Sequence, residues 1–409
     1  MPERDDRPDR KNALSIEDMG PATRAIHLGY DPASHQGALT PPVYMTSTFA
    51  FETAEEGADT VAGRRAGYVY GRAKNPTQTL LEQRIASLEG GEAGLATASG
   101  MGAISATMWT LLKAGETMVV DHAIYGSAFA FFMEGLTRFG VTVRLVDMTD
   151  LAAVEAAVGA TRPRLLYFES PSNPGVRILD IASLAAIAHG SGALAVVDNT
   201  FASPVLQQPI GLGADLVIHS ATKYLGGHGD LLAGVVVGRA DQVNAIRGFG
   251  LRWTTGATIA PHTAFLLLRG LKTLHLRVRQ HCASALTVAR FLEGSAKVAR
   301  VAYPMLDSFA GAGLARRQMA AGGGIVSLEM AGGKAAALRL IDALRMIHCA
   351  VSLGDAETLV QHPATMTHAS YTDEQRATAG ITDALVRFSV GLEEVDDILA
   401  DIAQALDAV

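Results

Sequence analysis

The sequence predicts an α/β protein whose central sheet is mostly parallel. Short, continuously apolar runs such as LAVVDN and DLVIHS alternate with longer runs of helical composition through the middle of the chain. Continuous hydrophobicity, as opposed to alternation, is typical of strands that are buried on both faces of a sheet. After about residue 260 the order changes, and long helical runs precede the apolar runs GIVSLEM and ALVRFSVG. This change indicates a smaller C-terminal α/β domain.

The length of the chain predicts more than one folding unit. Its 409 residues exceed what one ordinary hydrophobic core supports, and 49% hydrophobic against 18% charged residues is a globular composition. A charged run opens the chain, and a stretch rich in Gly, Pro, Thr and aromatic residues follows without a long helical period. We therefore expect a disordered leader at 1–18, an extended arm at 19–75, a large domain at 76–262 and a C-terminal domain at 263–409.

The expected elements follow one another as strand and helix. Each strand is a short apolar run, and each helix is a longer run rich in Ala, Leu and Ile. Strands are expected at 94–100, 117–122, 142–147, 164–170, 194–199 and 215–220, and helices at 101–115, 127–140, 151–159 and 181–192. In the C-terminal domain, one long helical run at 263–294 precedes strands at 324–330 and 384–391.

Composition also narrows the possible partners and the compartment. A net charge of −7 argues against a nucleic-acid or anionic-membrane partner, and no apolar stretch is long enough to span a bilayer. The charged opening MPERDDRPDRKN is not followed by the apolar core of a signal peptide. Cys282 and Cys349 are too few for a disulfide scaffold, and no histidines stand at metal-ligand spacing with acidic partners. We expect a cytoplasmic protein without a metal site.

Polar residues follow the expected strands at the points where these strands end. In open parallel sheets, ligands bind beyond the carboxyl ends of the strands, so these residues predict one pocket. Taken singly, a lysine after a strand is usually a surface residue, an aspartate a turn former and a serine a helix cap. The polar residues at strand ends are Ser99, Gly100 and Met101 after the first strand, Glu169, Ser170 and Asn173 after the fourth, Asp198 after the fifth, and Ser220, Thr222 and Lys223 after the sixth.

Together, these residues predict a site for pyridoxal phosphate. Ser99, Gly100 and Met101 open a helix whose free N–H groups and dipole favour an anion, and nearby hydroxyls add donors. The aldehyde of pyridoxal phosphate needs a lysine to form a Schiff base, for which Lys223 is the candidate. Its ring nitrogen needs a carboxylate in order to stay protonated, for which Asp198 is the candidate.

The spacing of these motifs resembles one enzyme family. YGRAKNPT, ASGMGAI, YGSAFAF, FESPSNP, VVDNT and HSATKYLGGHGDLLAG are similar to motifs of the Cys/Met-metabolism family of pyridoxal-phosphate-dependent enzymes, related to cystathionine γ-synthase. The resemblance runs from about residue 23 to the C-terminus. It implies the aminotransferase-like fold (fold type I), with the cofactor bound by the large domain. It also implies an arm that contacts a neighbouring subunit, and a homotetramer built from dimers that share active sites.

The resemblance assigns three residues to catalysis. Lys223 matches the Schiff-base lysine, which also shuttles protons between substrate and cofactor carbons. Asp198 matches the partner of the ring nitrogen. Tyr125 matches the tyrosine that stacks on the cofactor ring and serves as acid for the γ-leaving group. From its type alone, Tyr125 could equally be a core aromatic residue.

The resemblance further implies contacts to cofactor and substrate. Arg387 matches the arginine that clamps the substrate carboxylate, a bidentate task suited to guanidinium, although a structural ion pair is an equal alternative from the residue alone. The further cofactor contacts are Gly100, Met101, Asn173, Ser220 and Thr222, with Tyr70 and Arg72 reaching the phosphate of a neighbouring subunit. The further substrate contacts are Ser352, Ser127 and Val351.

The implied reaction is α,γ-elimination of L-methionine to methanethiol, 2-oxobutanoate and ammonia. The stretches AVSLGDAETLVQHPATMTHASYT and LVRFSVGLEEVDD are most similar to those of the methionine-cleaving members. Relatives that cleave cystathionine carry a glutamate where this chain has Val351. The chain departs from the methionine-cleaving pattern at Ser127, where a cysteine is usual, and at 252–254, where Arg-Trp-Thr replaces Lys-Asp-Met.

Other activities remain open from the sequence. A cystathionine γ-lyase or an O-acylhomoserine sulfhydrylase would use the same residues, the latter for γ-replacement. A regulator that binds the cofactor without catalysis is disfavoured, because binding alone requires neither an acid such as Tyr125 nor a carboxylate clamp such as Arg387.

Overall fold

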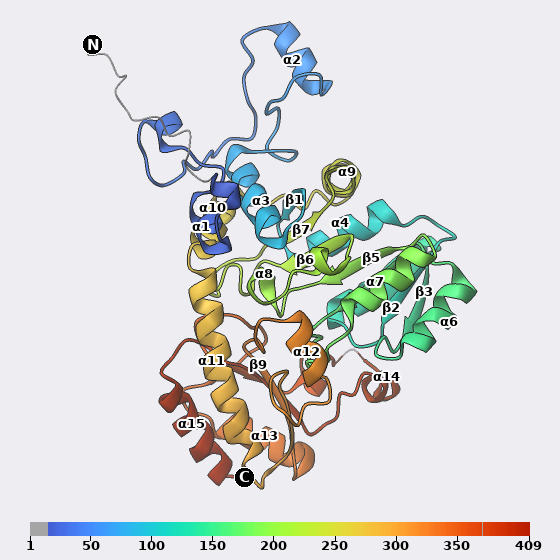
Figure 1. Cartoon of the computed structure of the whole chain (residues 1–409), viewed down its shortest axis with the longest axis vertical. Helices are drawn as coiled ribbons and strands as arrows, with labels where there is room; N and C mark the ends of the chain where they lie inside the picture. The colour runs from blue at the N-terminus through green and yellow to red at the C-terminus, as the bar shows by residue number, and fades with distance from the viewer. Residues whose placement is uncertain (1–14, 370) are drawn as a thin grey trace.

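The computed structural model describes residues 15–369 and 371–409 (Figure 1). Two sheets form its framework, one of seven strands in the order β1-β7-β6-β5-β4-β2-β3 and one of five in the order β10-β11-β12-β9-β8. The predicted fold class, α/β with a mostly parallel central sheet and a smaller C-terminal α/β part, is confirmed. The expected leader at 1–18 lies mostly outside the described residues, and within it Ile16–Asp18 form the short 3₁₀ helix η1.

The strands of the large sheet are β1 (Ala93–Thr97), β2 (Thr117–Asp121), β3 (Thr142–Val146), β4 (Leu165–Glu169), β5 (Leu194–Asp198), β6 (Leu216–Ser220) and β7 (Gly234–Gly238). β7 pairs antiparallel with both β1 and β6, so β1 and β6 run in the same direction. The other pairs are parallel. The carboxyl ends of β1, β2, β4, β5 and β6 therefore meet at one edge of the sheet.

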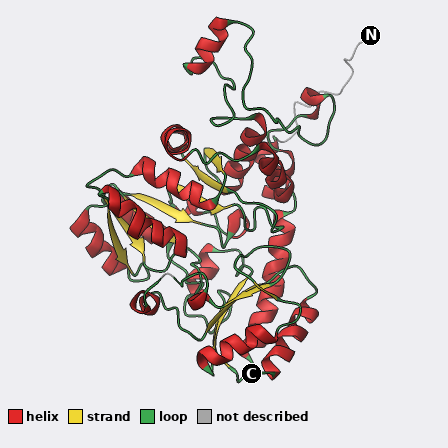
Figure 2. Ribbon diagram, turned by 180° about the vertical axis from the view of Figure 1, so that it is seen from behind, coloured by secondary structure: helices red, strands yellow, loops and turns green. Residues whose placement is uncertain are grey.

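Helices cover both faces of this sheet (Figure 2). Apolar side chains from alternate strand positions, such as Val196 and Ile218, pack with α4 and α5 on one face. Their neighbours, such as Val197 and Val217, pack with α6 and α7 on the other. The helices around the large sheet are α3 (Pro76–Glu89), α4 (Gly100–Leu111), α5 (Gly126–Ala130), α6 (Leu151–Thr161), α7 (Ile181–Gly190), α8 (Ser203–Leu206), α9 (Ala240–Ala245) and α10 (Pro261–Leu271), with η3 (Phe131–Gly135), η4 (Leu136–Phe139), η5 (Pro209–Leu212) and η6 (Ile246–Thr255).

The small sheet forms the core of the C-terminal part. Its apolar side chains pack against α11, α13 and α15, which cover it in the lower half of Figure 1. Its strands are β8 (Val298–Ala302), β9 (Ile325–Met330), β10 (His348–Cys349), β11 (Leu359–Gln361) and β12 (Leu385–Ser389). The helices of this part are α11 (Leu274–Glu293), α12 (Ala312–Gln318), α13 (Gly333–Ala343), η7 (Pro363–Thr365), α14 (Asp373–Thr378) and α15 (Val395–Asp407).

The arm is less extended than expected. It contains α1 (Pro21–His27), η2 (Pro32–His35) and α2 (Ala54–Val61), and α2 stands apart from the rest of the chain in Figure 1. Thr53 explains the start of α2, because its hydroxyl caps the amide of Glu56. Leu39 and Met45, in the loop before α2, are 83% and 73% exposed. This chain alone leaves much of the apolar surface of the arm uncovered.

Two helices expected to be continuous are interrupted. The run at 263–294 divides into α10, which ends at Leu271, and α11, which begins at Leu274. At this break, Arg277 Nη2 donates to the carbonyl of Gly270 at 2.9 Å. The run at 127–140 divides into α5, the π-helix η3 and the 3₁₀ helix η4. Among residues 15–369 and 371–409, no helix has both the length and the apolar character that crossing a membrane requires.

Candidate active site

A cavity of about 490 Å³ opens at the sheet edge where the parallel strands end. Loops that follow β1, β2, β4, β5 and β6 form one wall, which we call the sheet wall. Segments of the C-terminal part form the opposite wall, which we call the C-terminal wall. The sheet wall includes Gly100, Met101, Tyr125, Asn173, Asp198, Ser220, Thr222 and Lys223, and the C-terminal wall consists of Val351, Ser352, Leu353, Met366, Thr367 and Arg387.

Lys223 joins the two walls. Its Nζ donates a hydrogen bond to Ser352 Oγ at 2.8 Å. Burial lowers the pKa of Lys223, the nearby Arg387 lowers it further, and Asp355 opposes both. A lysine with a lowered pKa holds more of its amine in the neutral form, which is the form that attacks an aldehyde or accepts a proton.

Asp198 lies at the end of β5 and is 8% exposed. Its Oδ1 accepts hydrogen bonds from the amide (2.9 Å) and the hydroxyl (2.5 Å) of Thr200, and its Oδ2 accepts one from the Tyr167 hydroxyl at 3.4 Å. Burial raises the pKa of Asp198, while the bonds from Thr200 oppose the rise. The carboxylate is thus held in one orientation within the cavity.

The start of α4 offers an anion site. The amides of Gly100 and Met101 lie in its first turn, where a helix leaves N–H groups without partners of its own. A Cβ at Gly100 would lie only 3.0 Å from that of Ser220, so glycine allows the start of α4 to approach the end of β6 closely. The hydroxyl of Thr222 is already engaged, since it donates to the carbonyl of Ala233 at 3.2 Å.

One buried carboxylate connects Tyr125 and Asn173. Glu169, at the end of β4 and 4% exposed, accepts a hydrogen bond from the amide of Tyr125 through Oε1 (2.6 Å) and from that of Asn173 through Oε2 (3.2 Å). Burial, and then the charge of Asp198, hold the pKa of Glu169 well above its usual range. The position of Glu169 at the end of an apolar run places it at the predicted pocket, but the sequence gives no sign of these two bonds.

Arg387 is a buried cation that forms no salt bridge with the carboxylates of residues 15–369 and 371–409. It lies in the middle of β12 and is 2% exposed. Its Nη1 donates to Asn173 Oδ1 (2.8 Å) and its Nη2 to the carbonyl of Ser352 (2.6 Å), while its Nε has no hydrogen-bond partner in the part of the chain that the structure describes. Burial lowers the pKa of Arg387 to about 10. Burying a charge without an anion is costly, so this arrangement favours an anionic ligand over the structural ion pair.

The remaining predicted substrate contacts lie at the cavity, and the two arm residues do not. Ser127 and Val351 line the cavity, and Val351 is 57% exposed. Tyr70 and Arg72 are outside the cavity of their own chain, where Arg72 donates to the carbonyl of Arg252 at 3.2 Å. Trp253, one of the departures from the family pattern, is also outside it and is 72% exposed.

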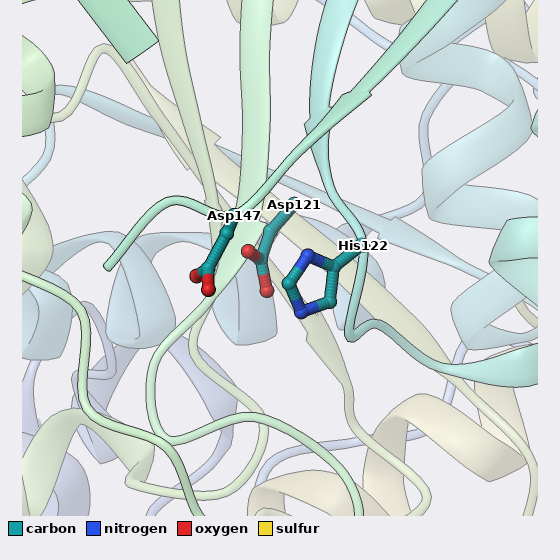
Figure 3. Close-up of side chains that lie close together, drawn as sticks. All are labelled: Asp121, His122 and Asp147. Atoms are coloured by element: carbon teal, nitrogen blue, oxygen red, sulfur yellow. The ribbon is translucent and has the colours of Figure 1, made fainter. Parts of the chain in front are cut away.

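An ion-pair network lies at the ends of β2 and β3, next to the loop that follows β4. Asp121, His122 and Asp147 come together at the ends of β2 and β3 (Figure 3), with possible ligand atoms within 4.8 Å of one another. Arg177 contacts all three side chains, at 3.1 Å for Asp121 and for His122 and more closely for Asp147. Since Arg177 follows Asn173 by four residues, the network ties the loop after β4 to the neighbouring strand ends.

The residues of the sheet wall fit pyridoxal phosphate. The first-turn amides of α4, which lie beside Ser220, suit its phosphate. A buried carboxylate at Asp198 suits its ring nitrogen, and a partly buried lysine of lowered pKa suits its aldehyde. On the opposite wall, the Nε of Arg387, which has no hydrogen-bond partner among the described residues, adds a place for the carboxylate of an amino acid.

Known proteins match this chain over nearly its whole length. A family model described as "Cys/Met metabolism PLP-dependent enzyme" matches residues 22–407, a range that includes every residue lining the cavity. The L-methionine gamma-lyase of Pseudomonas putida is 56% identical over 95% of this chain and 98% of that protein. The O-succinylhomoserine sulfhydrylase of Pseudomonas aeruginosa is 47% identical over 95% of each. The structure of cystathionine gamma synthase from Xanthomonas oryzae pv. oryzae in complex with cystathionine is similar with a TM-score of 0.90 and 41% identity, covering 95% of this chain and 98% of that one.

Proposed function

Because the chain belongs to the family of Cys/Met metabolism PLP-dependent enzymes, we propose that it is a carbon–sulfur lyase acting on L-methionine. The products are methanethiol, 2-oxobutanoate and ammonia, formed by α,γ-elimination. One observation carries the proposal: the cavity holds the amine of Lys223 and the buried guanidinium of Arg387 on facing walls. The similarity to L-methionine gamma-lyases of several bacteria supports the choice of substrate.

The sheet wall supplies the contacts that pyridoxal phosphate needs. Gly100, Met101 and Ser220 are the proposed phosphate contacts, with Thr222 beside them, and Asp198 holds the proton on the ring nitrogen. When bound, the cofactor withdraws electrons from the substrate α carbon, so that C–H bonds there and at the β carbon become acidic.

Lys223 moves the protons. Its neutral amine, which lines the cavity, accepts a proton from the substrate α carbon and then one from the β carbon. The bond to Ser352 Oγ fixes the direction of Nζ. Burial lowers the pKa of Lys223, which makes its ammonium form release a proton more readily than that of an exposed lysine.

Arg387 orients the substrate. Its guanidinium binds the substrate carboxylate, and its bonds to Asn173 Oδ1 and to the carbonyl of Ser352 prevent it from turning. Because Asn173 belongs to the sheet wall, the carboxylate site and the cofactor site are held in a fixed relation.

Tyr125 and Val351 face the other end of the substrate. The side chain of Tyr125 is 39% exposed at the cavity, and its hydroxyl delivers the proton that the departing sulfur needs. Val351 and Met366 present apolar surface, which suits a methyl thioether better than the distal ammonium group of cystathionine.

The test is a substrate panel on the purified chain with added pyridoxal phosphate. L-Methionine, L-homocysteine, L-cystathionine and O-acetyl-L-homoserine with sulfide are compared, scoring thiol, 2-oxobutanoate and ammonia together. We expect methionine to yield equal amounts of methanethiol, 2-oxobutanoate and ammonia. Preferred turnover of cystathionine, or formation of a new thiol amino acid without keto acid, overturns the proposal in favour of a γ-lyase for cystathionine or a sulfhydrylase.

We further propose a homotetramer of dimers in which the arm at 19–75 completes a neighbour's site. Supporting it, Tyr70 and Arg72 lie outside their own cavity, and Leu39 and Met45 are exposed on the same arm. Mixing inactive Arg72→Ala chains with inactive Lys223→Ala chains should restore activity, because some sites then receive both intact residues. Failure to restore activity in mixtures whose chains demonstrably exchange contradicts the proposal. The low cysteine number supports a cytoplasmic location, which fractionation of the native host can check.

A further inference from the structure

Lys223 lies in a turn that follows β6, and we call residues 220–227 the lysine turn. Two bonds within this turn involve the backbone of Lys223. Its amide donates to the carbonyl of Ser220 at 3.2 Å, and its carbonyl accepts from the amide of Gly227 at 2.8 Å. The place from which the Lys223 side chain enters the cavity therefore depends on how the lysine turn is held.

A buried arginine that does not line the cavity binds the lysine turn. Arg277, in the first turn of α11, is 7% exposed, and its Nη1 donates to the carbonyl of Tyr224 at 2.8 Å. Its Nη2 donates to the carbonyl of Gly270 at 2.9 Å, and its Nε donates to Thr273 Oγ1 at 3.2 Å. The planar guanidinium thus joins the lysine turn to the junction of α10 and α11 at three points.

Two glycines allow this contact. Gly227 has a φ of +72°, and a Cβ there would collide with the guanidinium of Arg277. A Cβ at Gly270, on α10, would lie 2.6 Å from the carbonyl oxygen of Gly226 and 2.7 Å from that of Leu225. The backbone of the lysine turn therefore packs directly against the junction of the two helices.

The same helix also contacts the C-terminal wall. His281 of α11 is fully buried, and its Nδ1 donates to the carbonyl of Val390 at 2.7 Å. Val390 directly follows β12, the strand that carries Arg387. The ring of His281 also packs against that of Tyr224, with centroids 5.3 Å apart. One helix thus contacts both the residue that follows Lys223 and the strand of Arg387.

The charge of Arg277 is expensive for the fold. Among residues 15–369 and 371–409 it forms no salt bridge, and burial lowers its pKa to about 10. Well-packed apolar side chains often replace a buried charge without loss of stability. The three donated bonds, one of them to the residue that follows Lys223, therefore give the reason for a guanidinium at this position.

We propose that Arg277 is a positioning residue that holds the lysine turn against the junction of α10 and α11 and thereby sets the place of Lys223 relative to Arg387. Arg277 acts through the backbone of Tyr224 and exchanges no proton with the substrate. The effect on catalysis rests on the proposed function, whereas the anchoring of the lysine turn does not.

The first experiment measures the lysine turn in the full chain freed of cofactor. Hydrogen–deuterium exchange followed by mass spectrometry compares a peptide that spans 220–227 with one that spans β5. Arg277→Met keeps a long side chain but removes every donor, so exchange in the lysine turn should be about tenfold faster and exchange in β5 unchanged. Arg277→Lys, with one donor nitrogen, should give a smaller increase. Arg279→Met, an exposed position of the same helix, should change neither peptide.

The second experiment measures the holoenzyme. Arg277→Met should lower kcat for methionine about tenfold to a hundredfold and leave KM within about twofold, because a small misplacement of Lys223 slows the chemical step more than it weakens binding. Gly227→Ala, which displaces the guanidinium, should lower kcat as well. In the double variant the loss should be smaller than the product of the two single losses, since both changes break the same contact.

The outcomes separate the anchoring from the proposed function. Unchanged exchange in the lysine turn of folded Arg277→Met, or equal acceleration in β5, overturns the anchoring, even where the parent chain turns over methionine strongly. Faster exchange confined to the lysine turn of a chain that does not cleave methionine overturns the proposed function and retains the anchoring. Faster exchange there with unchanged kcat overturns the effect on catalysis. Where circular dichroism shows that Arg277→Met does not fold, Arg277→Lys and Gly227→Ala provide the same comparisons.

Discussion

The two walls of the cavity are built in opposite ways. On the sheet wall, polar side chains end buried strands, and they are fixed by bonds within the wall, as Asp198 is by Thr200 and Tyr125 by Glu169. On the C-terminal wall, the Nε of Arg387 has no hydrogen-bond partner among the residues that the structure describes, Ser352 has an unusual backbone conformation, and Val351 is 57% exposed.

This difference separates two tasks. A wall whose groups are already satisfied is organised in advance for one permanent occupant. A wall that retains an unpaired cation and exposed apolar surface gains most from a ligand that comes and goes. The sheet wall therefore corresponds to the proposed cofactor and the C-terminal wall to the proposed substrate. Substitutions in the sheet wall should impair cofactor binding, and substitutions in the C-terminal wall should impair substrate binding.

The largest expected effect is that of Lys223→Ala on the sheet wall. Loss of the amine removes both the attachment of the cofactor and the proton carrier, so turnover should fall roughly a thousandfold or more. The absorbance band of lysine-bound cofactor should disappear as well. Lys334→Ala, an exposed lysine 3.6 Å from Asp383, is the matched control and should change neither. Retention of the band in Lys223→Ala would show that Lys223 is not the residue that attaches the cofactor.

A smaller effect is expected from Arg387→Lys on the C-terminal wall. Lysine cannot keep the bonds to Asn173 and Ser352 while also binding a carboxylate at two points, so kcat/KM should fall about thirty- to a hundredfold. Cofactor absorbance should remain, since the sheet wall is intact. Arg300→Lys, in the exposed pair with Glu329 of the same sheet, is the control. Loss of cofactor binding in Arg387→Lys with normal affinity for methionine would reverse the division of tasks.

The smallest effect tests selectivity within the C-terminal wall. Val351→Glu places a carboxylate at the apolar end of the cavity, so kcat/KM should fall about tenfold for methionine and rise for cystathionine, measured by 2-oxobutanoate release. Because Val351 is exposed, folding should be unaffected. Leu338→Glu on α13, outside the cavity lining, controls for the added charge. Equal loss on both substrates would mean that this position carries no selectivity.

Sequence reasoning predicted the sheet wall better than the C-terminal wall, for a physical reason. Strands buried on both faces must be continuously apolar, so their ends, and the polar residues after them such as Asp198 and Lys223, can be recognised from the chain alone. The antiparallel β7 was not anticipated, because a buried run such as GVVVG carries no sign of its direction.

Contacts between distant segments could not be predicted in the same way. The bond from Arg387 to Asn173 joins residues 214 positions apart, and neither residue carries a local sign of the other. The break between α10 and α11 depends on a bond from Arg277 to Gly270 inside an otherwise helical pattern. The bonds that Glu169 accepts from Tyr125 and Asn173 could not be predicted for the same reason, since these partners are brought together by the fold.

The two hydrogen bonds that Glu169 accepts have a mechanical consequence. A hinge motion that moves the C-terminal part away from the sheet has to separate Arg387 from Asn173 and Ser352 from Lys223. The amide of Asn173 and the amide of Tyr125 both donate to the Glu169 carboxylate, so a displacement of Asn173 also acts on the backbone of Tyr125. Glu169 therefore links the loop that Arg387 contacts to the backbone of Tyr125, a residue that lines the cavity.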